Sequence, residues 1–153
     1  MIVLDIMGVR VEVPSNAPML LLKESDGQRY LPIWIGAAEA SAIVNAMEGI
    51  VPPRPMTHDL MADILSQLGH SDIEGRITNV DDGTFYAELW IDGHAISARP
   101  SDVVALALRA GFRVLCPPEL MDQVGVELFE PAEDEVEKFR EFLDNISPDD
   151  FEH

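Results

Sequence analysis

Hydrophobic and polar residues alternate along the first third of the chain in the way that strands require. Residues 2–13 place apolar side chains at two-residue spacing, and Pro14 follows this run. The alternation continues in residues 19–23 and 29–35, which are separated by a Ser-Asp-Gly turn at residues 25–27. The pattern therefore predicts three strands joined in an antiparallel meander.

The periodicity then changes to that of a helix. Residues 37–48 are rich in alanine, and Gly49 follows at the position that commonly ends a helix. Three prolines within residues 51–55 exclude a helix there and predict a rigid connector. Residues 57–68 predict a second helix that has Thr57 as its N-cap and stops at Gly69. Its predicted buried stripe consists of Leu60, Ile64 and Leu68.

A second set of three strands precedes a third helix. The strands are predicted at residues 73–80, 84–91 and 94–98, with tight turns at Asp81-Asp82-Gly83 and Asp92-Gly93. Ser101 is predicted to cap the helix, and residues 103–108 are apolar on nearly every side, which predicts a buried helix. The remaining short elements are a strand at 112–116, a helix at 119–124 and a strand at 127–130.

This order of elements indicates an α+β fold: a single compact domain with a mixed or mostly antiparallel sheet, packed helices and a C-terminal amphipathic helix. Residues 1–131 are predicted to form the domain. Residues 132–153 are predicted to form an acidic helix and tail docked on that domain, with an apolar face made of Val136, Phe139, Leu143 and Ile146.

Composition narrows the class of protein. A chain of 153 residues with 47% hydrophobic residues can bury a core without a disulfide or a metal. Cys116 is its single cysteine, which excludes an intramolecular disulfide and a multi-cysteine zinc site and predicts a small buried hydrophobe. No apolar run reaches the length of a membrane span, and the N-terminus lacks the features of a signal peptide. We therefore expect a cytoplasmic protein with no membrane partner.

The net charge argues against a protein that coats nucleic acid by non-specific electrostatic binding. The chain has 10 basic and 28 acidic residues, a net charge of −18, so it gains little from counterion release at a polyanion. The charge is uneven, because residues 117–153 carry 13 of the acidic and 2 of the basic side chains. Any nucleic-acid role therefore needs local cations in the body of the protein.

Two segments repeat one local design at the start of predicted helices. Residues 54–59 and 99–102 each place an arginine and a proline before a hydroxyl residue, with an acid in the first helical turn. Glu39 opens the first helix in a similar way. The simplest interpretation is helix capping, because a carboxylate near a helix N-terminus is stabilised by the helix dipole.

A functional interpretation requires these helix starts to converge. Arg54 and Arg99 would then supply cations for phosphate, and His58 a proton carrier near neutral pH. Asp59 and Asp102 would supply oxygen ligands for a hard metal. That set of groups matches phosphodiester cleavage, in which a carboxylate-bound divalent ion would also reduce the repulsion between an acidic enzyme and its substrate.

The other chemistry-bearing residues favour structural roles. His70 and His94 border turns and are predicted to be solvated. The acidic turn at residues 81–83 lacks the ligand spacing of a calcium loop, and no Walker A, GxGxxG, HExxH, GxSxG or CxxC motif is present. Four aromatic residues have faces on which bases can stack, but their strand positions favour packing in the core and the sheet: Trp34, Phe85, Tyr86 and Trp90.

Several strings in the chain resemble the bifunctional nuclease family. They are RPMTHDL at residues 54–60, RPSDVVALALR at 99–109, IGAAEA at 35–40 and GTFYA at 83–87. Residues 139–151 are similar to the FREFLD…PDDF ending of the family, so the resemblance covers nearly the whole chain. Ser97 departs from the pattern, since many relatives carry an acid two residues before the arginine. The resemblance implies a compact α+β domain and nuclease activity on both RNA and DNA.

Carried onto this chain, the resemblance implies a set of site residues. We interpret His58, Asp59, Asp102 and Arg99 as catalytic, with His58 moving a proton. The residues that hold phosphate are expected to be Arg54, Arg99, Thr57 and Ser101. Glu39, Asp59 and Asp102 are expected to bind a divalent metal, Mg or Mn, or to orient water.

The sequence therefore predicts a low-specificity, metal-assisted nuclease that acts on single-stranded RNA or DNA. The alternative is a non-catalytic regulatory or protein-interaction module that binds a small anion or a partner in the same cleft. The net charge of −18 and the missing classical nuclease motif support that alternative. Alanine-rich helices and antiparallel sheet edges also predict a homo-oligomer of unassigned symmetry.

Overall fold

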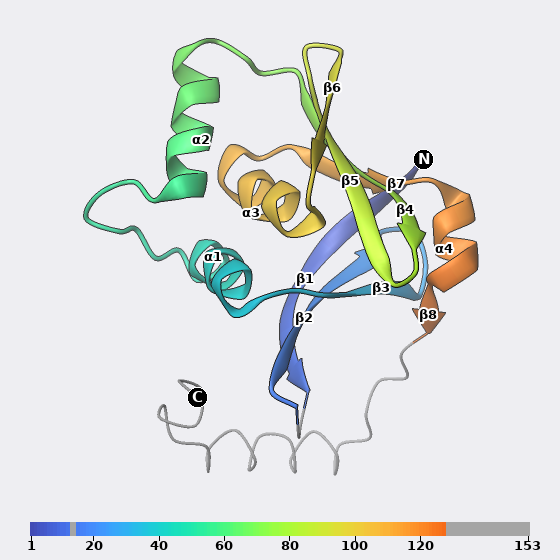
Figure 1. Ribbon diagram of the computed structural model, residues 1–153. Helices are drawn as coiled ribbons and strands as arrows, with labels where there is room; N and C mark the ends of the chain where they lie inside the picture. The colour runs from blue at the N-terminus through green and yellow to red at the C-terminus, as the bar shows by residue number, and fades with distance from the viewer. Residues whose placement is uncertain (13–14, 128–153) are drawn as a thin grey trace.

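A computed structural model describes residues 1–12 and 15–127, which form one mixed sheet with helices packed against it (Figure 1). The predicted α+β class is confirmed. The sheet has eight strands in the order β6-β5-β4-β7-β1-β2-β3-β8, and the pairing of β4 with β7 is parallel whereas the others are antiparallel. The strands are β1 (Ile2–Glu12), β2 (Ala17–Glu24), β3 (Arg29–Trp34), β4 (Ile73–Asp81), β5 (Thr84–Ile91), β6 (His94–Ala98), β7 (Arg113–Cys116) and β8 (Val126–Glu127).

The two predicted meanders, β1–β3 and β4–β6, are both present, and β7 joins them into one sheet. Leu115 of β7 is paired with Val3 on one side and with Arg76 on the other. The hairpin turns also follow the sequence prediction: Asp82 and Gly83 have φ of 50° and 77°, the left-handed conformation that Asp-Gly readily adopts in a two-residue turn.

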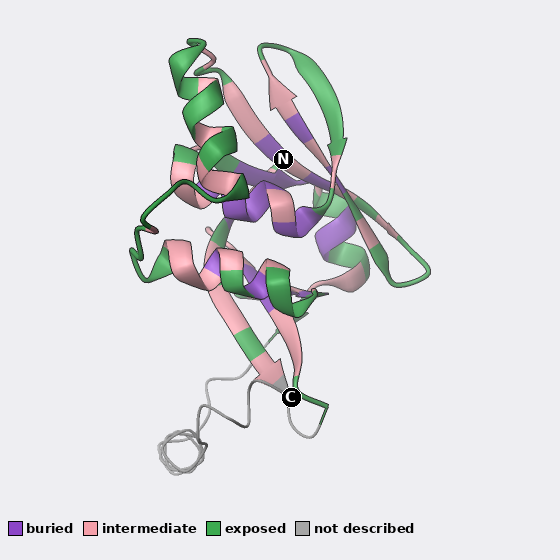
Figure 2. Cartoon of the chain, turned by 60° about the vertical axis from the view of Figure 1, so that its left-hand side comes forward, coloured by how far each residue is buried: buried purple, intermediate pink, exposed green. Residues whose placement is uncertain are grey.

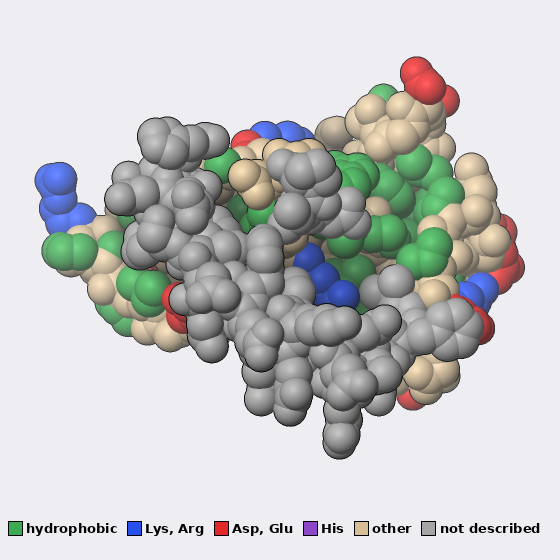
Figure 3. All heavy atoms as spheres, turned by 90° about the horizontal axis from the view of Figure 1, so that it is seen from below, with side chains coloured by type: hydrophobic (Ala, Val, Ile, Leu, Met, Phe, Trp, Pro, Cys, Tyr) green, Lys and Arg blue, Asp and Glu red, His purple; other side chains and the backbone are tan. Residues whose placement is uncertain are grey.

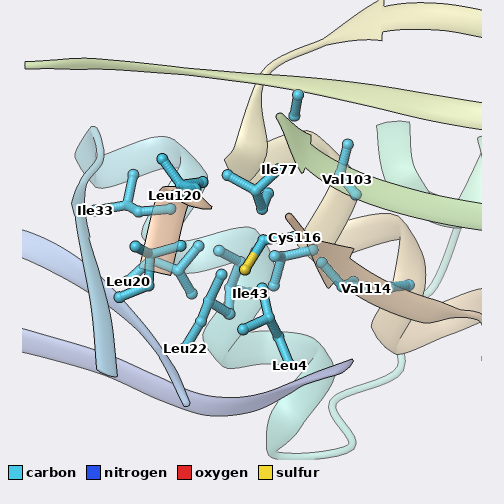
Figure 4. Close-up of a cluster of buried hydrophobic side chains, with 14 of the residues drawn as sticks. Leu4, Leu20, Leu22, Ile33, Ile43, Ile77, Val103, Val114, Cys116 and Leu120 are labelled. Carbon is cyan, nitrogen blue, oxygen red and sulfur yellow. The ribbon is translucent and has the colours of Figure 1, made fainter. Parts of the chain in front are cut away.

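Within the described residues, four helices accompany the sheet: α1 (Ala37–Met47), α2 (Thr57–Gln67), α3 (Pro100–Ala110) and α4 (Pro118–Val124). Helix α3 lies between α1 and α2 (Figure 1) and contacts both, as well as β4, β5 and β7. All residues from Val103 to Ala107 are buried, which confirms the predicted buried helix. Four of them join Ile43 of α1 and Leu20 and Leu22 of β2 in the main core cluster (Figure 4): Val103, Val104, Ala105 and Ala107.

The predicted buried stripe of α2 is wrong. Leu60, Ile64 and Leu68 are 52%, 47% and 68% exposed, and no residue of α2 is buried. The reason is tertiary: α2 packs mainly against α3, whereas α3 also packs against three strands of the sheet, and much of the surface of α2 is exposed (Figure 2). The helix therefore presents an apolar face that the rest of the described chain leaves uncovered.

The two predicted hydroxyl caps are also wrong. Helix α2 has Met56 as its N-cap, and α3 has Arg99, so Thr57 and Ser101 are already inside the first helical turn. In α2 the capping is done from within the helix, because the Asp59 carboxylate accepts a hydrogen bond from the Met56 backbone N–H at 3.0 Å. In α3, Pro100 occupies the first position, which suits proline because it has no N–H to satisfy.

The four aromatic residues divide into two pairs. Phe85 packs against the core cluster, and the Trp90 ring carries the Arg76 guanidinium 4.2 Å from its centroid, so packing is confirmed for these two. Trp34 and Tyr86 are 56% and 47% exposed, which contradicts the prediction. Trp34 follows buried Ile33 in β3, so the alternation of the strand turns it away from the core.

The smaller predictions have mixed outcomes. Cys116 is fully buried, and burial raises the pKa of its thiol to about 11, as expected for an unreactive hydrophobe. His94 is exposed as predicted, whereas the half-exposed His70 is bonded to Asp92.

The C-terminal predictions are only partly testable. Strand β8 begins at Val126, one residue before the predicted start, and residues 128–130 of that prediction lie outside the described residues. The helix and tail predicted for residues 132–153 also lie outside them. Among the residues that are described, none of the helices combines the length and hydrophobicity needed to cross a bilayer.

Candidate functional site

The N-termini of α1, α2 and α3 meet, and they bring together side chains that are far apart in the sequence. The Arg99 Nη1 atom donates to Glu39 Oε1 at 2.8 Å, which joins the starts of α3 and α1. His58 Nε2 lies 2.9 Å from Asp102 Oδ1, which joins the starts of α2 and α3. The start of α3 therefore contacts the starts of both other helices. Four predicted site residues are therefore in direct contact.

Arg99 is the hub of this cluster. Its Nε and Nη2 atoms donate to the two carboxylate oxygens of Asp102 at 2.8 and 3.1 Å, a bidentate pair, while Nη1 reaches Glu39. These bonds use three of the five N–H donors of the guanidinium group, and the Arg99 side chain is 63% exposed. The remaining two donors are available for a phosphate oxygen.

His58 is held by Asp102 in one orientation. With the carboxylate ionised, Nε2 carries the proton of this hydrogen bond, and Nδ1 is then the acceptor in a neutral ring. The His58 side chain is only 14% exposed, so its ring is shielded from most of the solvent. An oriented imidazole with a free acceptor nitrogen is the arrangement that a general base requires.

Both carboxylates of the cluster stay ionised near neutral pH. Burial opposes the ionisation of Asp102, but the hydrogen bonds from Arg99 and His58 outweigh it and hold the pKa of Asp102 below its usual value. The pKa of Glu39 is lowered by a hydrogen bond from its own backbone N–H and by the Arg99 guanidinium. Gly36 permits this arrangement, since a Cβ there would collide with the Glu39 carboxylate.

The cluster lines a hollow of about 330 Å³, which we call the helix pocket. Glu39, His58, Arg99 and Asp102 line it together with Thr57 and Arg109. Ser101 does not line the helix pocket and is 94% buried, with 6% exposure, at the edge of a neighbouring hollow. Arg54 is exposed, lines neither hollow, and has no hydrogen bond or ion pair within the described part of the chain.

Asp59 takes part in a separate contact with Arg109, which the sequence analysis missed. Arg109 Nε donates to Asp59 Oδ1 at 2.8 Å, and its other nitrogens donate to the carbonyl oxygens of Ala105 and Ala42. The Arg109 hydrogen bond is the main cause of the lowered pKa of Asp59. Arg109 thus ties α1, α2 and α3 together beneath the cluster. The sequence offered one signal for this role, because Arg109 directly follows the apolar run of residues 103–108 in a helix that is predicted to be buried.

The three carboxylates expected to bind metal do not share one ion position. Asp59 faces Arg109, while Glu39 and Asp102 are each turned toward Arg99. Within residues 1–12 and 15–127, no group of three His, Cys, Asp or Glu side chains is arranged to hold a metal ion. The residues as placed therefore do not fit a three-carboxylate metal site, and we derive no chemical step through a metal.

Comparison with known proteins identifies the family of the chain. Two curated relatives from strains of Mycobacterium tuberculosis, the uncharacterized proteins MT1877 and Rv1829, are each 52% identical over 156 residues. The match covers 95% of this chain and 95% of each relative. A family model described as the bifunctional nuclease domain matches residues 20–129, which include every residue of the cluster. The chain therefore belongs to the bifunctional nuclease domain family.

Proposed function

We propose that this protein is a low-specificity nuclease that hydrolyses phosphodiester bonds in single-stranded RNA and DNA in the helix pocket. The observation that supports this most directly is the His58–Asp102 pair, 2.9 Å apart, beside the exposed Arg99 guanidinium. A base, a residue that orients it and a cation for phosphate are the groups that phosphodiester hydrolysis needs. Family membership implies nucleic acid as the substrate class.

In the proposed reaction, water attacks the phosphorus atom while His58 Nδ1 accepts a proton from it. A new P–O bond forms, the bond to the leaving nucleoside oxygen breaks, and that oxygen takes a proton from solvent or from the imidazolium. Asp102 keeps the ring oriented and stabilises its cationic form. The two unused N–H donors of Arg99 bind phosphate oxygens as negative charge develops on them. The use of water as nucleophile requires no 2′-hydroxyl, so the proposed step can proceed on RNA and on DNA alike.

The charge around Arg99 limits affinity for substrate. One guanidinium is flanked by two ionised carboxylates, Glu39 and Asp102, so the cluster without a further cation repels phosphate. We therefore retain the prediction that Mg or Mn raises activity. Substrate phosphate oxygens would have to complete the ligand set of such an ion. Comparison of cleavage with Mg²⁺, with Mn²⁺ and with EDTA measures this requirement directly.

The nuclease assay uses purified protein with fluorescein-labelled single-stranded RNA and DNA. His58→Ala and Asp102→Ala are expected to abolish cleavage while the circular dichroism spectrum is retained. Arg99→Ala is expected to raise KM, because it removes the cation that faces phosphate. His94→Ala is the matched control: it removes an imidazole on edge strand β6, outside the pocket, and should leave activity unchanged. Cleavage that survives both His58→Ala and Asp102→Ala would disprove the assigned site.

The alternative function is a non-catalytic module that binds a small anion or a protein partner in the same pocket. The mutual neutralisation of Arg99, Glu39 and Asp102 favours it, because such a cluster can exchange one internal ion pair for a ligand. Tight binding that does not depend on metal, with no cleavage of either oligonucleotide, would support the module over the nuclease.

We also retain the proposals of a homo-oligomer and of a cytoplasmic location. The exposed apolar face of α2, made of Leu60, Ile64 and Leu68, supports self-association, because an uncovered stripe of this kind is costly in water. Figure 3 shows another face on which hydrophobic side chains gather at the surface. Fully buried Cys116, with its raised thiol pKa, is compatible with the cytoplasm, a reducing compartment.

A further inference from the structure

A second hollow adjoins the helix pocket and is not used by the proposed chemistry. It has a volume of about 330 Å³ and lies where the end of β3 meets the β4–β5 hairpin and the start of α3. We call it the strand-end pocket. Its walls include Ile33, Trp34, Ile35, Phe85 and Pro100, so most of the side chains that form it are apolar or aromatic.

The two pockets share a wall. Glu39 and Arg99, joined by their 2.8 Å ion pair, line both hollows. A phosphate bound to the free N–H donors of Arg99 therefore lies at the boundary between them. Because a nucleoside is attached on each side of a backbone phosphate, one neighbouring nucleoside is directed to the strand-end pocket while the scissile bond faces His58.

Trp34 gives the strand-end pocket an exposed aromatic surface. It is 56% exposed although it lies in a strand, and an indole left this open in water is unusual unless something covers it. Trp34 ends β3 two residues before Gly36, the residue whose lack of a Cβ leaves room for the Glu39 carboxylate. The aromatic face and the charged cluster are thus held by one short stretch of backbone.

From this juxtaposition we propose that the strand-end pocket is a nucleobase subsite in which Trp34 stacks on an unpaired base of the substrate. The inference rests on the proposed nuclease function and specifies its substrate as single-stranded. A base within a duplex is already stacked and cannot enter, whereas a base of a single strand can. Stacking tolerates every base, because each has a π-face, so the subsite contributes affinity without sequence preference.

The binding test observes Trp34 directly. The chain has two tryptophans, so Trp90→Phe leaves Trp34 as the only one. This replacement breaks no hydrogen bond, because the buried Trp90 Nε1 atom has none within the described part of the chain. In a His58→Ala background, which prevents cleavage, the protein is titrated with a short single-stranded oligonucleotide and with an abasic oligonucleotide of equal length. We expect the first to quench the emission of Trp34 and the second to leave it nearly unchanged.

The activity test compares three substitutions with otherwise wild-type protein. Trp34→Ala is expected to raise KM about 5- to 150-fold with little change in kcat, since stacking on a remote base is lost equally in the ground and transition states. Trp34→Phe keeps an aromatic face and should retain most of the affinity. Tyr86→Ala is the matched control, because Tyr86 is 47% exposed on β5 but does not line the pocket.

The results separate this inference from the proposed function. Equal quenching by the abasic oligonucleotide, or an unchanged KM in Trp34→Ala, would overturn the subsite while cleavage by the wild type still supported the nuclease. Base-dependent quenching with no cleavage by wild-type protein would support the subsite and exclude the proposed nuclease function. A rise in KM in Tyr86→Ala equal to that in Trp34→Ala would also overturn the assignment to Trp34.

Discussion

Replacement of Arg109 by methionine tests whether one side chain holds α2 in place. Helix α2 has no buried residue, so little apolar burial anchors it. The 14%-exposed Arg109 side chain instead bonds to Asp59 of α2 at 2.8 Å, to the Ala105 carbonyl at 2.7 Å and to the Ala42 carbonyl at 3.0 Å. Methionine keeps the apolar stem but removes all three bonds, leaving the Asp59 carboxylate with only the Met56 N–H.

The expected loss of unfolding free energy is about 3 kcal/mol. Hydrogen bonds to charged groups contribute about 1.5–3 kcal/mol each, and breaking a buried ion pair costs about 3–5 kcal/mol. The low end applies because Asp59 is 27% exposed and solvent compensates part of the loss. For a chain of this size the loss lowers Tm by roughly 6–12 °C. Thermal and urea unfolding, followed by circular dichroism at pH 7, measure it.

The dependence on pH follows from the lowered pKa of Asp59. A carboxyl with a depressed folded-state pKa contributes stability above its unfolded pKa and loses it as the pH falls through the folded value. The difference between wild type and Arg109→Met should therefore be full at pH 7 and should shrink below about pH 4. A double-mutant cycle with Asp59→Asn should give a coupling energy of about 1–3 kcal/mol.

Arg113→Met is the matched control, because this arginine is 69% exposed and its ion pair with Glu74 is long, at 3.6 Å. The loss of unfolding free energy in Arg113→Met should stay within about 0.5 kcal/mol. The reasoning is refuted if Arg113→Met costs as much as Arg109→Met, or if the effects of Arg109→Met and Asp59→Asn simply add. Activity should also fall in Arg109→Met, since His58 is carried on α2.

Three further predictions concern the other parts of the molecule. Glu39→Gln removes one of the two charges that repel phosphate and should lower KM for the same labelled oligonucleotides, and Gly36→Ala, which places a Cβ against the Glu39 carboxylate and displaces it from Arg99, should shift KM in the same direction; a KM equal to that of wild type in Gly36→Ala would contradict this role of the glycine. Ile64→Glu should shift an oligomer toward the monomer in light scattering coupled to size exclusion, whereas Ser66→Glu, at an exposed position on the opposite side of the same helix, should not. Cys116, whose pKa is raised to about 11, should react with a thiol reagent at pH 8 only after denaturant is added; rapid reaction of native protein would show that its burial is incomplete.

Most of the secondary structure could be predicted from the sequence, because its signals are local. The alternation in β1 to β6, the Asp-Gly turns and the apolar run of α3 each depend on neighbours within a few residues. The class of fold followed from the order of these elements. The helix starts could also be recognised as candidate sites from their arginine, hydroxyl and acidic residues, although the N-caps themselves lay one or two residues earlier than predicted.

Tertiary structure decided which of these local features face one another. Periodicity showed that α2 has an apolar stripe, but whether a stripe is buried depends on another element covering it, and here none in the described chain does. Trp34 is a similar case: the alternation of β3 places it on the face opposite Ile33, and whether that face is covered depends on the neighbouring elements. Asp59 bonds to Arg109 and does not share a metal site with Asp102, which likewise depends on how α2 and α3 cross.

The sequence by itself therefore determined the elements, the family resemblance and the kinds of chemical group available. Only the fold decided that His58 meets Asp102 across 44 residues and that Arg99 meets Glu39 across 60. Hydrophobic patterning acts within single elements, whereas contacts at these separations are set by how α1, α2 and α3 pack together. That packing placed one imidazole, one guanidinium and two carboxylates around a common pocket and directed the third carboxylate away from it.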